Sequence, residues 1–212
     1  MSTYDLEEQE QLAALKTWWK QYSGLIAALM IVVLLILTAW QGWGWYQRTQ
    51  AAQAAGFYEQ LQQAVRANDL KASRDAAGSV LEQYPRTIYA PLAALLSAKI
   101  HYQTGDLKTA RVQLQWAIDH APSIQIKSIA RLRLANVLVD DRTPEDAVKL
   151  LEEKAADEYA VLFAIARGDI YLVLKKFQEA KAAYKSALSD PGKLEESMRE
   201  LVQLKLDALG ES

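Results

Sequence analysis

The sequence predicts an all-α protein in which a single N-terminal transmembrane helix precedes a solenoid of short helix pairs. The first observation is an uninterrupted stretch without Asp, Glu, Lys or Arg over residues 21–47. The second is that apolar side chains after this stretch recur at the spacing of amphipathic helices, with no strand-like alternation. The third is a series of turn signals, such as Asn68–Asp69 and Gly105–Asp106, that divide the remaining chain into short helices.

The composition excludes several classes of function. Because the chain has no cysteine, it cannot form a disulfide scaffold, a thiol nucleophile or a cysteine zinc site. The 24 basic and 26 acidic residues nearly balance, which disfavours a dedicated nucleic-acid-binding protein. The mean hydropathy of −0.11 conceals an uneven distribution, because the apolar residues are concentrated in the uncharged stretch.

Aromatic residues flank the uncharged stretch on both sides. A helix of about 20 residues spans the ~30 Å hydrocarbon core of a bilayer, and tryptophan and tyrosine favour its two interfaces. We therefore expect a short amphipathic segment over residues 1–20, a transmembrane helix over 21–46 in contact with membrane lipid, and a soluble domain over 47–212. The residues expected at the two membrane interfaces are Trp18, Trp19, Tyr22, Trp40, Trp43, Trp45 and Tyr46.

The span is predicted to be an uncleaved anchor. A signal peptide has a basic start and a small-residue cleavage site, whereas this chain has an acidic start, including Asp5 and Glu7. Lys16 and Lys20 precede the span and only Arg48 follows it closely, so the positive-inside rule favours a cytoplasmic N-terminus. Residues 47–212 would then be periplasmic, on a single-pass protein of the inner membrane of a Gram-negative cell.

A sequence frame recurs in the soluble part. A turn at Gly105–Asp106 leads to the small residue Ala110, and the frame returns with Ala147 and again with Ala180. These intervals of 37 and 33 residues are close to the ~34-residue period of tetratricopeptide repeats, which the frame resembles. We predict a tetratricopeptide-like α-solenoid of three to four helix pairs, the fourth being a degenerate unit over residues 68–85. An ordinary helical bundle with coincidental alanine spacing is the alternative.

Small residues recur where paired helices are expected to cross, because helix axes 8–10 Å apart need small side chains at the contact. They are Ala98, Ala135 and Gly168 on the first helices, and Ala110, Ala147 and Ala180 on the second. The turn at Asp190–Gly192, with Pro191, closes the last frame. A capping helix over residues 193–209 is expected to bury Leu194, Met198, Leu201 and Leu209 on one side.

The first helices of the pairs are expected to line a concave groove. Equivalent positions form two apolar rows, one polar row and one mixed row, which could hold an amphipathic helix or an extended apolar segment of a partner. The alternative is that the chain covers its own groove, with the helix around Phe57 or with the C-terminal helix. The groove residues are Leu92, Leu95, Lys99, Tyr102, Ile129, Leu132, Asn136, Val139, Leu162, Ile165, Asp169 and Leu172.

The sequence contains no recognisable catalytic set. It has no HExxH, GxSxG or phosphate-loop pattern, and Gly42–Gly44 falls at the membrane boundary instead of in a phosphate loop. His101 is expected to be a packed core histidine, and His120 to lie at a helix end. We therefore expect no enzymatic activity, no catalytic residues, no cofactor and no metal.

The whole chain resembles the YfgM-like family of ancillary subunits of the bacterial Sec translocon. The resemblance rests on Glu8–Lys20 before the single span, on Arg167–Tyr171, and on Ala180–Leu188. It implies a periplasmic tetratricopeptide-like domain, association with the SecYEG translocon and with a membrane-anchored periplasmic chaperone of the PpiD type, and assistance to newly exported polypeptides. The alternative function is a scaffold or regulator of another envelope complex, in cell division or envelope-stress signalling.

Overall fold

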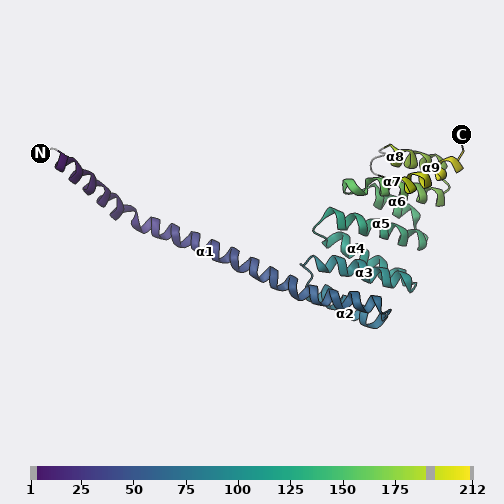
Figure 1. Cartoon of the computed structure of the whole chain (residues 1–212), viewed down its shortest axis with the longest axis horizontal. Coiled ribbons are helices and arrows are strands. Elements are labelled where there is room, and N and C mark those ends of the chain that lie inside the picture. The colour runs from purple at the N-terminus through teal and green to yellow at the C-terminus, as the bar shows by residue number, and fades with distance from the viewer. Residues whose placement is uncertain (1–3, 190–193, 211–212) are drawn as a thin grey trace. The chain divides into compact units, whose positions relative to one another are not determined.

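The computed structural model of the chain describes residues 4–189 and 194–210 (Figure 1). It divides into two units, residues 1–49 and residues 50–212. All regular elements within the described ranges are helical, which confirms the predicted fold class. They are α1 (Tyr4–Arg66), α2 (Leu70–Gln83), α3 (Tyr89–Gln103), α4 (Leu107–His120), α5 (Ile124–Asp140), α6 (Pro144–Glu152), the 3₁₀ turn η1 (Asp157–Tyr159), α7 (Ala160–Val173), α8 (Phe177–Leu188) and α9 (Glu196–Ala208).

The first unit consists of the long helix α1 up to Thr49. Apolar side chains along its uncharged stretch, such as Leu34 and Ile36, are exposed. Among the described residues, α1 is the one helix long and apolar enough to cross a membrane. The helix begins before the predicted span and continues beyond it, because helix-forming residues (alanine, glutamine and leucine) flank the apolar stretch on both sides.

The second unit is a stack of short helices in chain order. Each helix from α2 to α8 packs on the next, and residues 50–66 of α1 pack on α2 through Leu61, Ala77 and Val80. Packing between successive helices, without one central core, distinguishes this array from an ordinary bundle. Three apolar clusters fill it, which contain Leu61, Leu114 and Tyr184 respectively.

Four turns that follow first helices share one geometry. Asn68, Gly105, Arg142 and Lys175 each adopt a left-handed conformation, with φ between 58° and 79°. In each turn, the next residue donates its N–H to a carbonyl five residues earlier, at 2.8–2.9 Å. This hydrogen bond is typical of a helix C-terminus with a left-handed residue after it. Thus the second frame, which lacks the turn glycine, makes the same turn with Arg142.

The small residues predicted at helix crossings are all buried, as expected. Ala110, Ala135, Ala147 and Ala180 have no exposed surface, and Ala98 has almost none. Gly168 contacts the ring of Tyr184 so closely that a Cβ atom there would lie 2.4 Å from the ring carbon Cε1. The close approach of α7 to α8 therefore requires glycine at this position.

The C-terminal helix differs from the prediction in its buried face. Leu201 is 47% exposed, whereas its neighbour Val202 is completely buried in the cluster around Tyr184. Met198, Val202 and Leu206 of α9 pack in this cluster at a four-residue spacing, and Leu201 lies about 100° around the helix from Val202. Leu194, just before α9, and Leu209, just after it, also pack there. The inclusion of Leu201 was therefore wrong. Lys193 and the predicted turn at Asp190–Gly192, with Pro191, lie outside the described residues.

Candidate functional site

The strongest candidate site is a hollow of about 390 Å³ between α3, α4 and α5. Its floor is apolar and consists of Ala98, Leu114 and Val137, all buried. Its rim is polar. The rim residues are Lys99, Tyr102, Gln103, Arg133 and Asn136.

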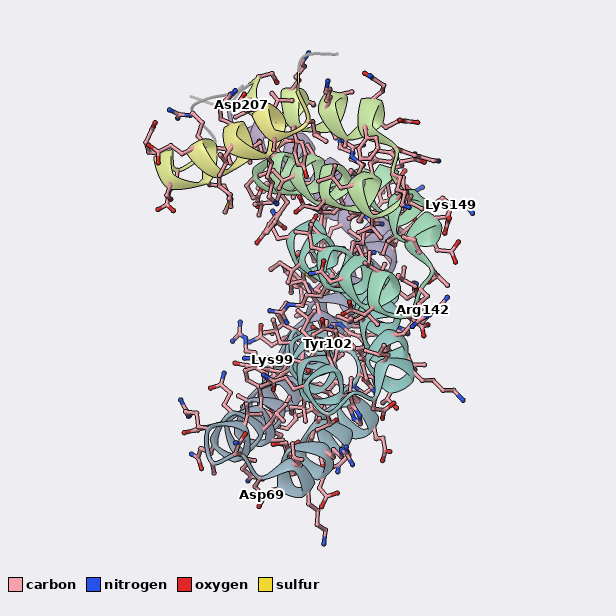
Figure 2. The ribbon with its side chains drawn as sticks, turned by 90° about the vertical axis from the view of Figure 1, so that its right-hand side faces the viewer. Asp69, Lys99, Tyr102, Arg142, Lys149 and Asp207 are labelled. Atoms are coloured by element: carbon pink, nitrogen blue, oxygen red, sulfur yellow. The ribbon has the colours of Figure 1, made fainter. Side chains whose placement is uncertain are left out.

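Figure 2 shows Lys99 toward the left of the helix stack, whereas Arg142 and Lys149 lie on its right. The hollow brings together three predicted groove residues, Lys99, Tyr102 and Asn136. Sequence reasoning missed Gln103 and Arg133, because it took only one position in each helical turn. Arg133 precedes Asn136 by three residues, so the helical repeat places both on one face of α5 and could have identified it.

Tyr102 is held in place across two helices. Its hydroxyl donates a hydrogen bond to Oδ2 of Asp140 on α5, at 2.5 Å. This bond raises the pKa of Tyr102 above its usual value, because the carboxylate of Asp140 accepts a hydrogen bond from the neutral phenol and its charge opposes ionisation. The ring at the rim is therefore anchored before any partner binds.

The rim carries positive charge. Arg133 donates one hydrogen bond from Nη1 to the carbonyl oxygen of Leu95, at 3.3 Å, and its side chain remains exposed. Lys99 is exposed and forms no hydrogen bond or ion pair with any residue that the structure describes. The two cations beside an apolar floor suit a segment that combines carboxylates with an apolar side chain.

The apolar rows contribute less open surface than the sequence suggests. Leu95 and Ile165 are buried in the core, at 5% and 8% exposure. Leu162 is exposed, whereas the remaining three residues of these rows are half-buried: Leu92, Ile129 and Leu132. Val139, which belongs to the mixed row, is half-buried as well.

The last pair is covered by the chain itself. Asp169 on α7 accepts hydrogen bonds from the hydroxyl of Tyr184, at 2.5 Å, and from Nζ of Lys205 on α9, at 2.6 Å. Leu172 packs against the cluster that contains Val202 of α9. The predicted polar row consists of Lys99, Asn136 and Asp169. The first two side chains are exposed and can contact a partner, whereas Asp169 is already bonded to Tyr184 and Lys205.

The two histidines have structural contacts away from the hollow. Nδ1 of His101 lies 2.9 Å from Asp106, which also caps α4 by accepting from the backbone N–H of Thr109. The hydrogen bonds from Thr109, followed by that with His101, lower the pKa of Asp106. His120 stacks on Trp116, with ring centroids 4.2 Å apart. In the part of the chain that the structure describes, no three His, Cys, Asp or Glu residues cluster as metal ligands.

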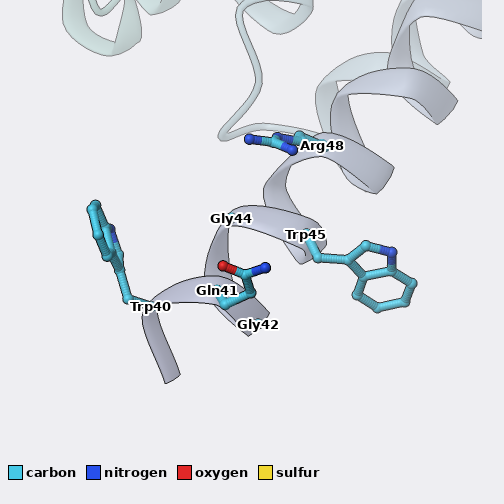
Figure 3. A pocket seen from close by; sticks show the side chains of 6 residues that line it. All are labelled: Trp40, Gln41, Gly42, Gly44, Trp45 and Arg48. Atoms are coloured by element: carbon cyan, nitrogen blue, oxygen red, sulfur yellow. The ribbon is translucent and has the colours of Figure 1, made fainter. Parts of the chain in front are cut away.

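The first unit has a second hollow, of about 580 Å³, on α1. Figure 3 shows its lining, with Trp40 and Trp45 projecting to either side of Gly44. All seven aromatic residues predicted at the membrane interfaces are exposed. Rings pair between Trp18 and Tyr22 and between Trp43 and Tyr46.

Comparisons with known proteins cover nearly the whole chain. The family described as "Tetratricopeptide repeat-like domain" matches residues 16–211. Similar proteins include an "Ancillary SecYEG translocon subunit" of Neisseria gonorrhoeae, 29% identical over 96% of this chain and 98% of its own length. Proteins with the same description from Aggregatibacter actinomycetemcomitans and Escherichia coli are 27% and 24% identical; the alignments cover 97% and 99% of this chain, respectively, and 99% of each relative.

Proposed function

This chain belongs to the tetratricopeptide repeat-like family, and from that premise we propose that it is a non-catalytic, membrane-anchored adapter associated with the SecYEG translocon. The observation that carries the proposal is the near full-length similarity to proteins described as ancillary SecYEG translocon subunits. An adapter needs a binding surface but no reacting groups, and the hollow between α3 and α5 offers such a surface.

We further propose that α1 anchors the protein through its span over residues 21–46, with a short cytoplasmic segment over 1–20 and a periplasmic domain over 47–212. The exposed apolar side chains of α1, together with tryptophans near both ends of the span, support this arrangement. Anchoring beside the translocon raises the effective concentration of the domain at the membrane, so a modest affinity for each partner suffices.

The proposed task is to couple the translocon to a periplasmic chaperone of the PpiD type and to assist newly exported polypeptides. The partner segment would place an apolar side chain on the floor formed by Ala98, Leu114 and Val137, and its carboxylates near Lys99 and Arg133. The anchored Tyr102 and the amide of Asn136 would select the register of the segment. The remaining predicted groove positions would contribute flanking contacts.

In-cell photo-crosslinking tests this assignment. A crosslinker at Lys99 or Asn136 should capture a translocon subunit or a periplasmic chaperone, identified by mass spectrometry. A crosslinker at Lys149 is the matched control, because that exposed side chain lies on the opposite side of the stack. At Leu172 we expect capture of the protein's own α9.

Two outcomes would contradict the proposal. Equal capture from Lys149 and Lys99 would show that the hollow is not the binding surface. Consistent capture of components of cell division or of envelope-stress signalling, without translocon subunits, would favour the alternative scaffold function.

A further inference from the structure

We infer that Gln41, Gly44 and Arg48 on α1 form a binding site for the phosphate of an anionic glycerophospholipid. The inference rests on the proposed membrane anchor, since it requires this end of the span to lie at the membrane–water interface. The site is the 580 Å³ hollow of the first unit, which lies on one face of α1. Its residues are helical and do not form a phosphate-binding loop.

The three residues share one helical face. Their spacing of three and then four residues aligns them along α1. Because helical side chains lean toward the N-terminus, Arg48 extends back over the turn that contains Gly44. In Figure 3 the Gln41 amide and the Arg48 guanidinium lie on either side of Gly44, where the missing side chain leaves the hollow open.

The glycines of this turn have no packing role within the described chain. A Cβ atom at Gly42 or Gly44 would meet nothing within 4 Å apart from the chain neighbours and the local helix backbone. Glycine is less favourable than alanine in the interior of a helix, so two glycines this close together weaken α1. No contact within the described chain requires glycine at either position. The space at Gly44 is therefore available to a group outside this chain.

The charge of Arg48 is uncompensated. The sequence has no Asp or Glu between Glu10 and Glu59. Arg48 is exposed and forms no ion pair or hydrogen bond with the residues that the structure describes. A guanidinium binds phosphate oxygens with two parallel hydrogen bonds, and the Gln41 amide can donate a further one.

The position along α1 favours a lipid phosphate over other anions. Arg48 immediately follows the uncharged stretch, where the hydrocarbon core gives way to headgroups. Trp40 and Trp45 flank the hollow with rings that favour this interface and with indole N–H donors. A phosphodiester held at Arg48 would leave its acyl chains beside the apolar surface that precedes Trp40.

Native mass spectrometry of the full-length chain in detergent micelles tests the site, with phosphatidylglycerol as the probe and phosphatidylcholine for comparison. The wild type should retain phosphatidylglycerol preferentially. Arg48→Gln should weaken its binding roughly tenfold through the loss of charge-assisted hydrogen bonds. Gly44→Leu should weaken it similarly by filling the hollow, although the charge is unchanged and leucine is the better helix former.

Arg66→Gln is the matched control, since it removes an exposed arginine at the C-terminal end of the same helix. Equal losses in Arg66→Gln and Arg48→Gln, or full binding by Gly44→Leu, would overturn the site. Loss of a co-purified translocon subunit in Gly44→Leu, with lipid binding intact, would also overturn it and assign the hollow to a partner helix. Release of the wild type from membranes by alkaline extraction would instead contradict the proposed anchor.

Discussion

Gly168 and Tyr184 show how one pair of residues determines the approach of two helices. The tyrosine ring occupies the space that a side chain at position 168 would need, and its hydroxyl donates to Asp169 on the same helix as Gly168. Tyr184 is completely buried and is the largest such side chain among the residues that the structure describes. The contact between α7 and α8 therefore depends on glycine at one position and on tyrosine at the other.

Gly168→Ala should destabilise the protein by about 1–3 kcal/mol, because the new methyl group overlaps the ring of Tyr184 and one helix must shift. Gly78→Ala in α2 is the control, since a Cβ atom there meets nothing within 4 Å. It should stabilise the protein by roughly 0.5–1 kcal/mol through helix propensity. Urea denaturation followed by circular dichroism measures both changes, and destabilisation by both substitutions would contradict this reading.

Tyr184 should also make the protein less stable at alkaline pH. Burial, followed by the hydrogen bond to Asp169, raises the pKa of Tyr184 above its usual value near 10. Above about pH 10 the unfolded chain loses this proton while the folded chain keeps it. Stability that is present below pH 10 is therefore lost as the pH rises, by roughly 1.4 kcal/mol per pH unit for one proton.

Tyr184→Phe should remove this contribution. Unfolding free energies of the variant and the wild type, measured between pH 9 and pH 11.5, should converge as the pH rises. Parallel pH profiles would show that Tyr184 ionises equally in the folded and unfolded states.

At the scale of the helix, α9 shows how a terminal element covers the end of an array. It buries Val202 and pairs Lys205 with Asp169 on α7, so it engages a position that the preceding pairs leave open. The four left-handed turns act at the same scale, because each ends a first helix with the same hydrogen bond. They keep successive pairs in equivalent arrangements despite different residues at the turn.

Val202→Ala should destabilise the protein by about 1–2.5 kcal/mol, because it leaves a cavity in the cluster around Tyr184. Leu201→Ala removes a larger side chain, but one that is nearly half exposed, and should change stability by at most about 0.5 kcal/mol. Thermal or urea denaturation of the two variants compares adjacent positions on one helix. A larger effect at Leu201 would contradict the burial seen in α9.

At the scale of the whole molecule, the chain combines two parts with different surfaces. The first unit exposes apolar side chains along α1, whereas the second buries most of its apolar residues in three clusters and exposes charge. The apolar surface of α1 is stable in a lipid environment, and the charged surface of the second unit is stable in water. This contrast explains how a chain with near-neutral mean hydropathy supports membrane anchoring.

Protease added to intact spheroplasts should digest residues 47–212 while sparing the short N-terminal segment, because the balance of positive charges around the span favours a cytoplasmic N-terminus. Antibodies against tags at each end would follow the two parts. Detergent lysis is the control and should make both ends accessible. Protection of the C-terminal tag in intact spheroplasts would reverse the proposed orientation.

The sequence by itself determined the helical class, the apolar stretch, the turns and the small residues at the crossings. These features follow from local periodicity and short-range hydrogen bonds, which residues close together in the chain specify. Only the tertiary structure decided that Leu95 and Ile165 lie in the core, that α3, α4 and α5 enclose the hollow beside Lys99, and that Lys205 engages Asp169. The tertiary structure also decided that α9 buries Val202 and leaves Leu201 exposed. Those outcomes depend on how helices distant in sequence pack, because a helical pattern identifies an apolar face but not the neighbour that covers it.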